Sequence, residues 1–317
     1  MKTYNVYLLY ILIILATTFF FFSHFKLQQT KTSEGFQQDG PFVLKQNHHI
    51  YDSFYAEIYD TVAYPERICS LVARKVIDVL QPSPEHSTFL CIGSGTGSLL
   101  NCLHENKFAH TFGLDKSQSM VDVSKTKYPL LPVKHGDVLD SMTYDRSSFT
   151  HIFCINQTFY EIEDKSIFFR NCYSWLQPNG YLILHLVNGD KYDPLNIKNS
   201  PFNISLATKY SKKRINKHTA DFSGFSYTNG YNVSRVDYPT VGEDAAPNAC
   251  VITQKETFLD KSTANIRENE RKITVESANS VLRLAGEHGF IVKGKIVLDQ
   301  TPINDPHQFI YILERSH

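Results

Sequence analysis

The chain has 317 residues, of which 42% are hydrophobic and 20% are charged, a composition typical of folded globular domains. Its 32 basic residues balance its 32 acidic residues, which excludes bulk electrostatic attraction to nucleic acid or to an acidic membrane surface. The six cysteines form no Cys-x-x-Cys pair and no metal-ligand spacing stands out, so neither a compact disulfide framework nor a metal centre is predicted.

The first segment of the chain is strongly apolar. From Tyr4 to Phe22 it contains no charged residue, and as a helix it would be roughly 28 Å long, about one bilayer core. It ends in four phenylalanines without a small-residue cleavage site, which favours an uncleaved transmembrane anchor over a signal peptide. We assign residues 1–25 to this membrane anchor and residues 26–47 to a polar linker.

The side of the membrane on which the folded domain lies is weakly marked. Lys2 on one flank and Lys26 and Lys31 on the other barely discriminate an orientation. The absence of paired cysteine motifs favours the reducing cytosol, whereas the sequons at Asn203 and Asn232 keep a lumenal location open. We expect a single-pass membrane protein with a cytosolic domain.

Two helices are predicted to open the folded domain, which we assign to residues 48–317. The first covers residues 51–60 and carries Tyr55 and Tyr59 on one face. This aromatic stripe is either packing of a covering helix or part of a ligand site. The second helix covers residues 67–80 and is stopped by two prolines.

A glycine-rich turn follows the first predicted strand, Thr88–Ile92. Gly93, Gly95 and Gly97 alternate before a helix begins at Ser98. Glycine allows a sharp turn and close approach of a ligand, and the helix start supplies free N–H groups. The stretch therefore predicts a pocket for a nucleotide-like cofactor, although an ordinary strand-to-helix turn would have the same pattern.

Acidic residues close the next two predicted strands. Asp115 ends the second strand about twenty residues after the glycines. A carboxylate at this place can accept hydrogen bonds from both ribose hydroxyls, or it can cap the following helix. Asp137 follows Gly136 at the end of a third strand, where the Gly-Asp pair alone is also a common turn.

The central part of the predicted sheet continues with an almost wholly apolar fourth strand, Phe149–Ile155, which is typical of a buried parallel strand. It leads into Asn156 and Tyr160. A helix at 164–176 and the phrase Leu-x-Pro-x-Gly then precede a fifth strand, Tyr181–Val187, because proline ends a helix and glycine permits the turn.

The alternation of strands and helices breaks at residues 188–277. β segments are predicted at 222–231, 233–238, 251–258 and 266–275, with Asn229-Gly230 as a turn. We interpret this part as an antiparallel insertion that covers the cofactor mouth and shapes an acceptor site; a structural flap is the alternative. A helix at 277–288 and strands at 291–298 and 309–314 complete the domain.

The order of these motifs resembles that of class I S-adenosylmethionine-dependent methyltransferases of the small-molecule type. The resemblance covers residues 50–317, loosely in the insertion, and includes the phrase from Lys116 to Met120, which is similar to the family's pattern after the second strand. It implies an α/β fold with a doubly wound, mostly parallel, Rossmann-like sheet of seven strands whose last strand is antiparallel. It also implies S-adenosyl-L-methionine as the cofactor.

The resemblance assigns roles to individual residues. It places the cofactor on Gly93, Ser94, Gly95, Thr96 and Gly97, the ribose on Asp115 beside Lys116, the adenine on Met120, Asp137 and Val138, and the methionine moiety on Asn156. It places the acceptor on Tyr55, Tyr59 and Tyr160, with His185 or Tyr160 as a base, unless His185 is a packed core residue. Cys91 departs from the family, which usually has an acidic residue two positions before the first glycine.

The expected activity is transfer of a methyl group to an oxygen or nitrogen atom of a small molecule. Two alternatives stay open: a cofactor-binding module that has lost catalysis, suggested by Cys91, and a nicotinamide-dependent oxidoreductase. A nucleic-acid methyltransferase is disfavoured by the neutral charge and by the absence of the proline-containing signatures of those enzymes. The sequence predicts neither the acceptor nor the oligomeric state.

Overall fold

The computed structural model describes Thr17 and residues 41–192, 194, 216–236, 249–299 and 305–316. Apart from Thr17, the predicted anchor at residues 4–22 lies outside this part of the chain. No helix within the described ranges has the length and apolar character needed to cross a membrane.

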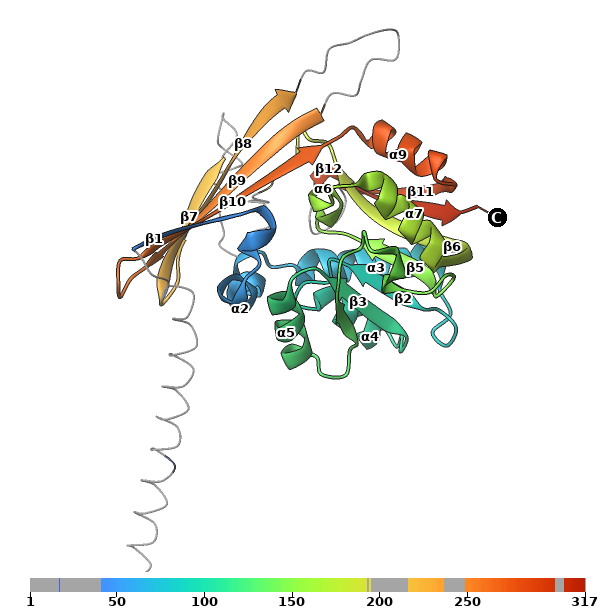
Figure 1. The fold of residues 1–317 in the computed structure, drawn as a ribbon, viewed down its shortest axis with the longest axis horizontal. Coiled ribbons are helices and arrows are strands. Elements are labelled where there is room, and N and C mark those ends of the chain that lie inside the picture. The colour runs from blue at the N-terminus through green and yellow to red at the C-terminus, as the bar shows by residue number, and fades with distance from the viewer. Residues whose placement is uncertain are drawn as a thin grey trace, which may run out of the picture.

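A seven-stranded sheet forms the centre of the α/β body (Figure 1), in the order β11-β12-β6-β5-β2-β3-β4. The five strands from β4 to β6 are parallel to their neighbours, whereas β12 is antiparallel to both β6 and β11. The predicted mixed α/β sheet of seven strands with an antiparallel last strand is therefore confirmed. The strands are β2 (Phe89–Ile92), β3 (Thr111–Asp115), β4 (Val133–His135), β5 (Phe149–Cys154), β6 (Leu176–Val187), β11 (Phe290–Leu298) and β12 (Asp305–Arg315).

Both faces of this sheet are covered by helices. In β2, Leu90 and Ile92 pack into one apolar cluster with α7 and α9, while Phe89 and Cys91 pack into a second cluster with α3 and α4. The alternation explains why β2 is apolar at every position: both of its faces are removed from water. The helices of the body are α3 (Glu66–Leu80), α4 (Ser98–Glu105), α5 (Gln118–Lys127), α6 (Thr158–Glu161), α7 (Lys165–Trp175) and α9 (Ala278–Glu287), with a 3-10 turn, η3 (Ser141–Thr143).

Side chains placed just before three of these helices cap their N-termini. Ser117, Asp164 and Ser277 each accept a hydrogen bond from a backbone N–H in the first turn of α5, α7 and α9. Such caps satisfy N–H groups that a helix leaves unpaired. They fix where each helix begins and thereby the loops between the strand ends and the helices.

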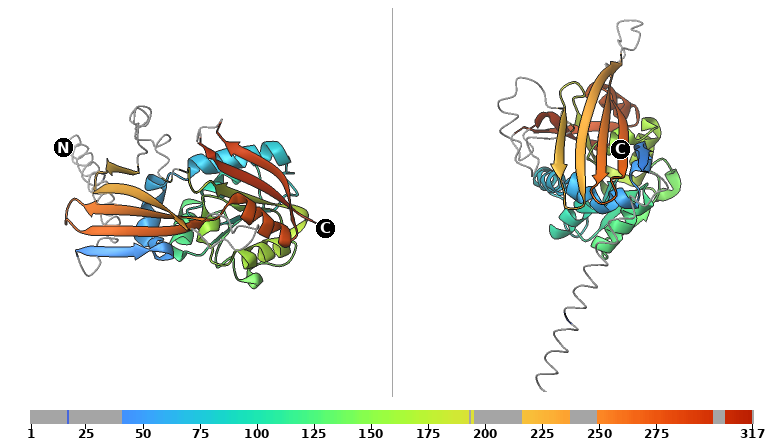
Figure 2. Two further views of the ribbon diagram at one scale, coloured as in Figure 1. Left: turned by 90° about the horizontal axis from the view of Figure 1, so that it is seen from above. Right: turned by 90° about the vertical axis from the view of Figure 1, so that its left-hand side faces the viewer.

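A second sheet of five strands extends from one end of the α/β body (Figures 1 and 2), in the order β1-β10-β9-β8-β7. Four of its strands come from the predicted insertion and are antiparallel to one another. The strands are β1 (Phe42–Gln46), β7 (Lys217–Asp221), β8 (Phe225–Val236), β9 (Ala249–Asp260) and β10 (Ile266–Val275).

Two features of the second sheet differ from the sequence-based expectation. Residues 42–46, within the predicted linker, form the edge strand β1, which pairs in parallel with β10. Asn229-Gly230 forms no turn but lies in the middle of β8, opposite Glu256 and Lys255 of β9. The side-chain amide of Gln254 donates to Asn229, and this cross-strand contact holds an Asn-Gly pair in an extended strand.

Helix α2 (Ser53–Val62), preceded by the 3-10 turn η2 (Asn47–Ile50), connects the two sheets. Phe54 and Tyr55 of α2 pack in one apolar cluster with Tyr227 and Phe258 of the five-stranded sheet and with Met120 of α5. Asp52 caps α2 by accepting from the Tyr55 N–H, as expected for a helix at this place. The predicted aromatic stripe thus lies between the α/β body and the insertion.

Candidate cofactor and acceptor site

A cavity of about 720 Å³ opens at the carboxyl ends of β2, β3, β4 and β5. In open α/β sheets, ligands bind in the crevice outside the carboxyl ends of the strands. Ten of the eleven residues predicted to hold the cofactor line this cavity, the exception being Gly97. The ten are Gly93, Ser94, Gly95, Thr96, Asp115, Lys116, Met120, Asp137, Val138 and Asn156.

The first two glycines of the turn both have positive φ angles, but they differ in what a side chain would meet at each position. At Gly93, with φ of 64°, a Cβ atom would lie 2.4 Å from the Cγ2 atom of Thr158. At Gly95, with φ of 53°, the nearest atom to a Cβ would be the ring of Tyr59 at 3.9 Å. Gly95 therefore keeps a face of the cavity open, whereas Gly93 lets α6 approach β2.

Gly97 does not line the cavity and supports the turn from behind. It caps α4 with φ of 89°, and a Cβ atom there would lie 2.5 Å from Ser124 Oγ and 2.9 Å from the ring of Tyr128. The predicted cofactor contact of Gly97 is thus not matched by its place in the structure. Its missing side chain allows α5 to pack against the start of α4.

Asp115 is bound to the glycine turn through its carboxylate. One oxygen accepts from the Gly95 N–H at 2.7 Å, and the other accepts from the Ser117 N–H at 2.9 Å. Burial raises the pKa of Asp115, and these two hydrogen bonds only partly oppose the shift. Because a carboxylate can accept about four hydrogen bonds, two further donors, such as a pair of ribose hydroxyls, can still be accommodated.

Asp137 and Lys116 meet at the mouth of the cavity, where their side chains form a salt bridge of 2.8 Å. Burial would raise the pKa of Asp137, but the hydrogen bonds from Lys116 and from the Leu139 N–H lower it below its ordinary value. Met120 and Val138 are buried and line the same region. The structure therefore brings together the residues predicted for the ribose and the adenine.

The backbone after β5 is held in an uncommon conformation. Asn156 and Gln157 both have positive φ, at 54° and 66°, a conformation that non-glycine residues adopt at some cost in free energy and that often occurs at functional sites. The Asn156 amide donates to Cys69 Sγ at 3.6 Å. Cys91 also lines the cavity, and burial raises the pKa of its thiol, so this position carries no negative charge.

The two residues predicted as a catalytic base occupy different places. Tyr160 lines the cavity, but its hydroxyl accepts from the Val187 N–H at 2.9 Å, and burial raises its pKa. His185 is fully buried and is not among the described residues that line either of the two cavities at the site. His185 is therefore a packed core residue, because β6 directs it into the interior rather than toward the site, and its predicted catalytic role is corrected.

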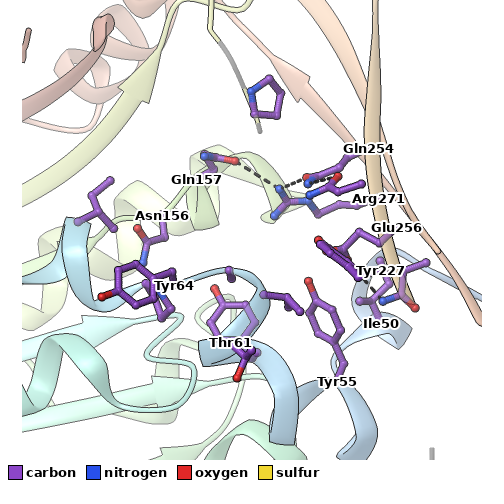
Figure 3. Close-up of a pocket in the computed structure, with 18 of the residues that line it drawn as sticks. Ile50, Tyr55, Thr61, Tyr64, Asn156, Gln157, Tyr227, Gln254, Glu256 and Arg271 are labelled. Carbon is purple, nitrogen blue, oxygen red and sulfur yellow. Dashed lines mark hydrogen bonds between the residues drawn. The ribbon is translucent and has the colours of Figure 1, made fainter. Parts of the chain in front are cut away.

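A smaller chamber of about 190 Å³, drawn in Figure 3, shares part of its wall with the larger cavity. It lies between α2 and the five-stranded sheet, and the two spaces share Tyr51, Tyr59, Pro65, Asn156 and Arg271. Tyr55 faces only the smaller chamber, Tyr59 faces both, and Tyr160 faces only the larger one. The tyrosines predicted to contact an acceptor thus lie around adjoining spaces.

Arg271 of β10 stands at the junction of the two spaces. Its guanidinium donates to Glu161 at 3.0 Å, to Gln157 at 3.4 Å and to Gln254 at 2.7 Å, as Figure 3 shows for the last two. The Tyr51 hydroxyl donates to the same Glu161 carboxylate at 2.8 Å. The sequence analysis did not predict that polar residues of β9 and β10 line the site. Their alternation along the predicted strands of the insertion is the one sequence feature that could have indicated it.

A family profile described as a methyltransferase domain matches residues 90–184, from β2 into β6. The matched segment, residues 90–184, carries a methyltransferase domain, in agreement with the predicted class I S-adenosylmethionine-dependent family. S-adenosylmethionine is the cofactor of this domain, in agreement with the predicted cofactor. The residues present fit this cofactor, because the cavity has the volume of a small-molecule site and Gly95 leaves its wall free of a side chain.

A curated relative of this methyltransferase domain is the phosphoethanolamine N-methyltransferase of Plasmodium falciparum (isolate 3D7). It is 28% identical over 111 residues, which are 32% of this chain and 39% of the relative. The chain therefore matches about two fifths of that relative's length.

Solved structures have a similar fold over 82–83% of this chain. An S-adenosylmethionine-dependent methyltransferase from Clostridium acetobutylicum has a TM-score of 0.55 at 14% identity, covering 83% of this chain and 98% of its own. The sugar N-methyltransferase KedS8 from Streptoalloteichus sp. also has a TM-score of 0.55, at 16% identity, covering 82% and 93%. A third is an amino pentose methyltransferase from Micromonospora echinaspora with bound S-adenosylmethionine, with a TM-score of 0.53 at 15% identity, covering 82% and 97%.

Proposed function

We propose that this chain transfers the methyl group of S-adenosylmethionine to a nitrogen or oxygen atom of a small-molecule acceptor. The observation that carries the proposal is the junction of the two spaces. The larger cavity is bordered by the glycine turn and Asp115, and the smaller polar chamber meets it at Tyr59, Asn156 and Arg271. A donor in the first space and an acceptor in the second would meet there.

The bound cofactor supplies a methyl group on an already activated sulfonium. The residues of the chain therefore mainly position the two reactants and exclude water, which can lower the barrier by roughly 7–11 kcal/mol. Asp115 and the glycine turn would hold the adenosine end, and Asn156 would lie beside the methionine end. The tyrosines of α2 and Arg271 would orient the acceptor from the other side.

Names of similar proteins support a small acceptor. The curated relative acts on phosphoethanolamine, and two of the solved structures are named for sugars or amino pentoses. The neutral net charge gives no support for nucleic acid as the acceptor.

Membrane tethering through residues 4–22, with the domain on the cytosolic side, is part of the same proposal and rests on the apolar run in the sequence.

The proposal is tested by incubating the full chain with S-adenosylmethionine and a panel of small amines, alcohols, phenols and acids, and measuring S-adenosylhomocysteine formed. Turnover of at least one acceptor is expected. Binding of S-adenosylhomocysteine without turnover of any acceptor would favour the module that has lost catalysis. Thermal stabilisation by NAD(H) but not by S-adenosylhomocysteine would favour the oxidoreductase.

Extraction of membranes at alkaline pH tests the anchor, because a spanning chain stays in the pellet.

A further inference from the structure

Glu256 of β9 is a buried carboxylate that lines the smaller chamber. Only 7% of the surface of Glu256 is exposed to solvent. It is the only carboxylate among the described residues around this space, and Figure 3 shows it beside Tyr227, opposite Asn156. Glu256 does not line the larger cavity.

 The Glu256 carboxylate accepts its hydrogen bonds from neutral groups. The Tyr227 hydroxyl donates to one oxygen of the Glu256 carboxylate at 2.6 Å, and the Asn269 amide donates to the other at 3.4 Å. Among the described residues, Glu256 forms no salt bridge, because the neighbouring arginines are engaged elsewhere: Arg267 pairs with Asp52 at 2.9 Å, and Arg271 pairs with Glu161 at 3.0 Å.

Aromatic rings surround the same chamber. Tyr55 and Tyr227 line it close to Glu256, and burial, followed by the charge of Glu256, raises the pKa of both phenols. They therefore stay neutral and offer ring faces, which attract cations. Four further tyrosines line the chamber, namely Tyr51, Tyr59, Tyr64 and Tyr192.

A buried carboxylate without a cationic partner is unfavourable unless a ligand completes it. A protonated amine supplies the missing positive charge and donors for the carboxylate, and its alkyl groups can lie against the tyrosine rings. A neutral hydroxyl would leave the charge of Glu256 uncompensated. Among the described residues around the chamber, Arg67 on α3 is a second arginine beside Arg271, on the side where an anionic part of an acceptor would lie.

We propose that Glu256, together with the rings of Tyr55 and Tyr227, binds an ammonium group of the acceptor and thereby selects small amines over the corresponding alcohols. This inference rests on the proposed function, because it assigns the smaller chamber to the acceptor. Glu256 forms no covalent bond and holds the charge of the acceptor. At the junction with the larger cavity, a neutral nitrogen or oxygen atom of the acceptor would form a bond to the methyl carbon while the carbon–sulfur bond breaks and S-adenosylhomocysteine leaves. One proton would pass from the acceptor to solvent, and an ammonium nitrogen that is itself methylated would lose this proton first.

The test compares the wild-type full chain with Glu256→Gln, which keeps the size of the side chain and its hydrogen-bonding groups but removes the charge. The probes are two matched pairs, ethanolamine with ethylene glycol and glucosamine with glucose, in binding titrations of the protein saturated with S-adenosylhomocysteine and in turnover assays. Glu268→Gln is the control, because Glu268 lies on β10 and does not line the chamber.

We expect an amine of the panel to bind and react in preference to its alcohol, and Glu256→Gln to lower its kcat/KM by at least tenfold. S-adenosylhomocysteine affinity and thermal unfolding should match the wild type, and Glu268→Gln should change nothing. Equal use of alcohols, failure of both amines to bind, or an unchanged kcat/KM in Glu256→Gln would overturn the inference. Lack of S-adenosylhomocysteine binding by the wild type would instead contradict the proposed function.

Discussion

At the scale of single residues, the three glycines of the turn are required for different reasons, although they are evenly spaced in the sequence. A Cβ atom at Gly93 or Gly97 would clash with Thr158 or Ser124, whereas at Gly95 it would point into the cavity with only the Tyr59 ring nearby, at 3.9 Å. The sequence predicted the turn but could not distinguish these reasons, because the atoms that each glycine avoids come from distant parts of the chain.

Gly95→Ala tests the distinction. The positive φ of 53° should cost about 1–2 kcal/mol of stability, so the protein should still fold. The added methyl group narrows the cavity, and the affinity for S-adenosylhomocysteine measured by calorimetry should fall at least tenfold. Gly286→Ala on α9, where a Cβ meets no atom within 4 Å, is the matched control. Unchanged affinity in Gly95→Ala would contradict a cofactor face at this residue.

His185 gives a prediction about the pH dependence of stability. Burial lowers its pKa from about 6.5 to about 4, and this outweighs the opposite influence of Gln308 and Asp305. Below pH 6.5 the unfolded chain therefore binds a proton that the folded protein does not, so stability should fall as the pH decreases from 6.5 toward 4. The contribution of this one residue is about 3 kcal/mol across the window.

Urea unfolding of wild type and His185→Leu at several pH values between 4.5 and 7.5 measures this contribution. The loss of stability on acidification should be smaller in His185→Leu. It should not vanish, because burial also lowers the pKa of His151 to about 4. Parallel pH profiles for the two proteins would show that His185 does not titrate in this way.

At the scale of elements, the central sheet was predictable because β2, β3 and β4 end in a glycine turn or an acidic residue and β5 is an almost wholly apolar run. The second sheet was only partly predictable. β1 has just five residues, and its pairing with β10 joins residues more than two hundred positions apart. Asn229-Gly230 favours a turn locally, but its pairing with β9 overrides that preference.

The same limits apply to the site. The residues predicted to hold the cofactor follow strand ends in sequence order, so their place at one cavity could be predicted. The chamber residues Glu256 and Arg271 are ordinary alternating polar residues of β9 and β10, and only the packing of α2 against the second sheet gives them a cavity to face.

Arg267 is the residue that holds α2 to the second sheet. It is 1% exposed and donates to Asp52 at 2.9 Å, to the Ile50 carbonyl at 3.1 Å and to Asn269 at 2.9 Å. Arg267→Met removes these three hydrogen bonds, and the free energy of unfolding in urea should decrease by about 2–4 kcal/mol. The exposed Arg283→Met on α9 should have an effect within about 0.5 kcal/mol. Equal stabilities would mean that Arg267 does not hold α2.

At the scale of the whole molecule, each of the two sheets lines a different part of the site. The seven-stranded sheet supplies the cofactor cavity at its carboxyl edge, and the five-stranded sheet supplies most of the polar wall of the chamber. Helix α2 lies between them and contributes tyrosines to both spaces. The chamber that we propose for the acceptor is therefore built mainly by the second sheet and α2, beside the cavity of the α/β body.

The most direct test of this account is the affinity of the full chain for S-adenosylhomocysteine, measured by calorimetry on wild type, Asp115→Asn and the exposed control Asp145→Asn. The account predicts binding by the wild type and the control, and a 10- to 100-fold loss in Asp115→Asn, about 1.4–2.7 kcal/mol. Thermal unfolding without ligand checks that Asp115→Asn is folded. A folded Asp115→Asn protein with wild-type affinity would contradict the assignment of this cavity to the methyl donor.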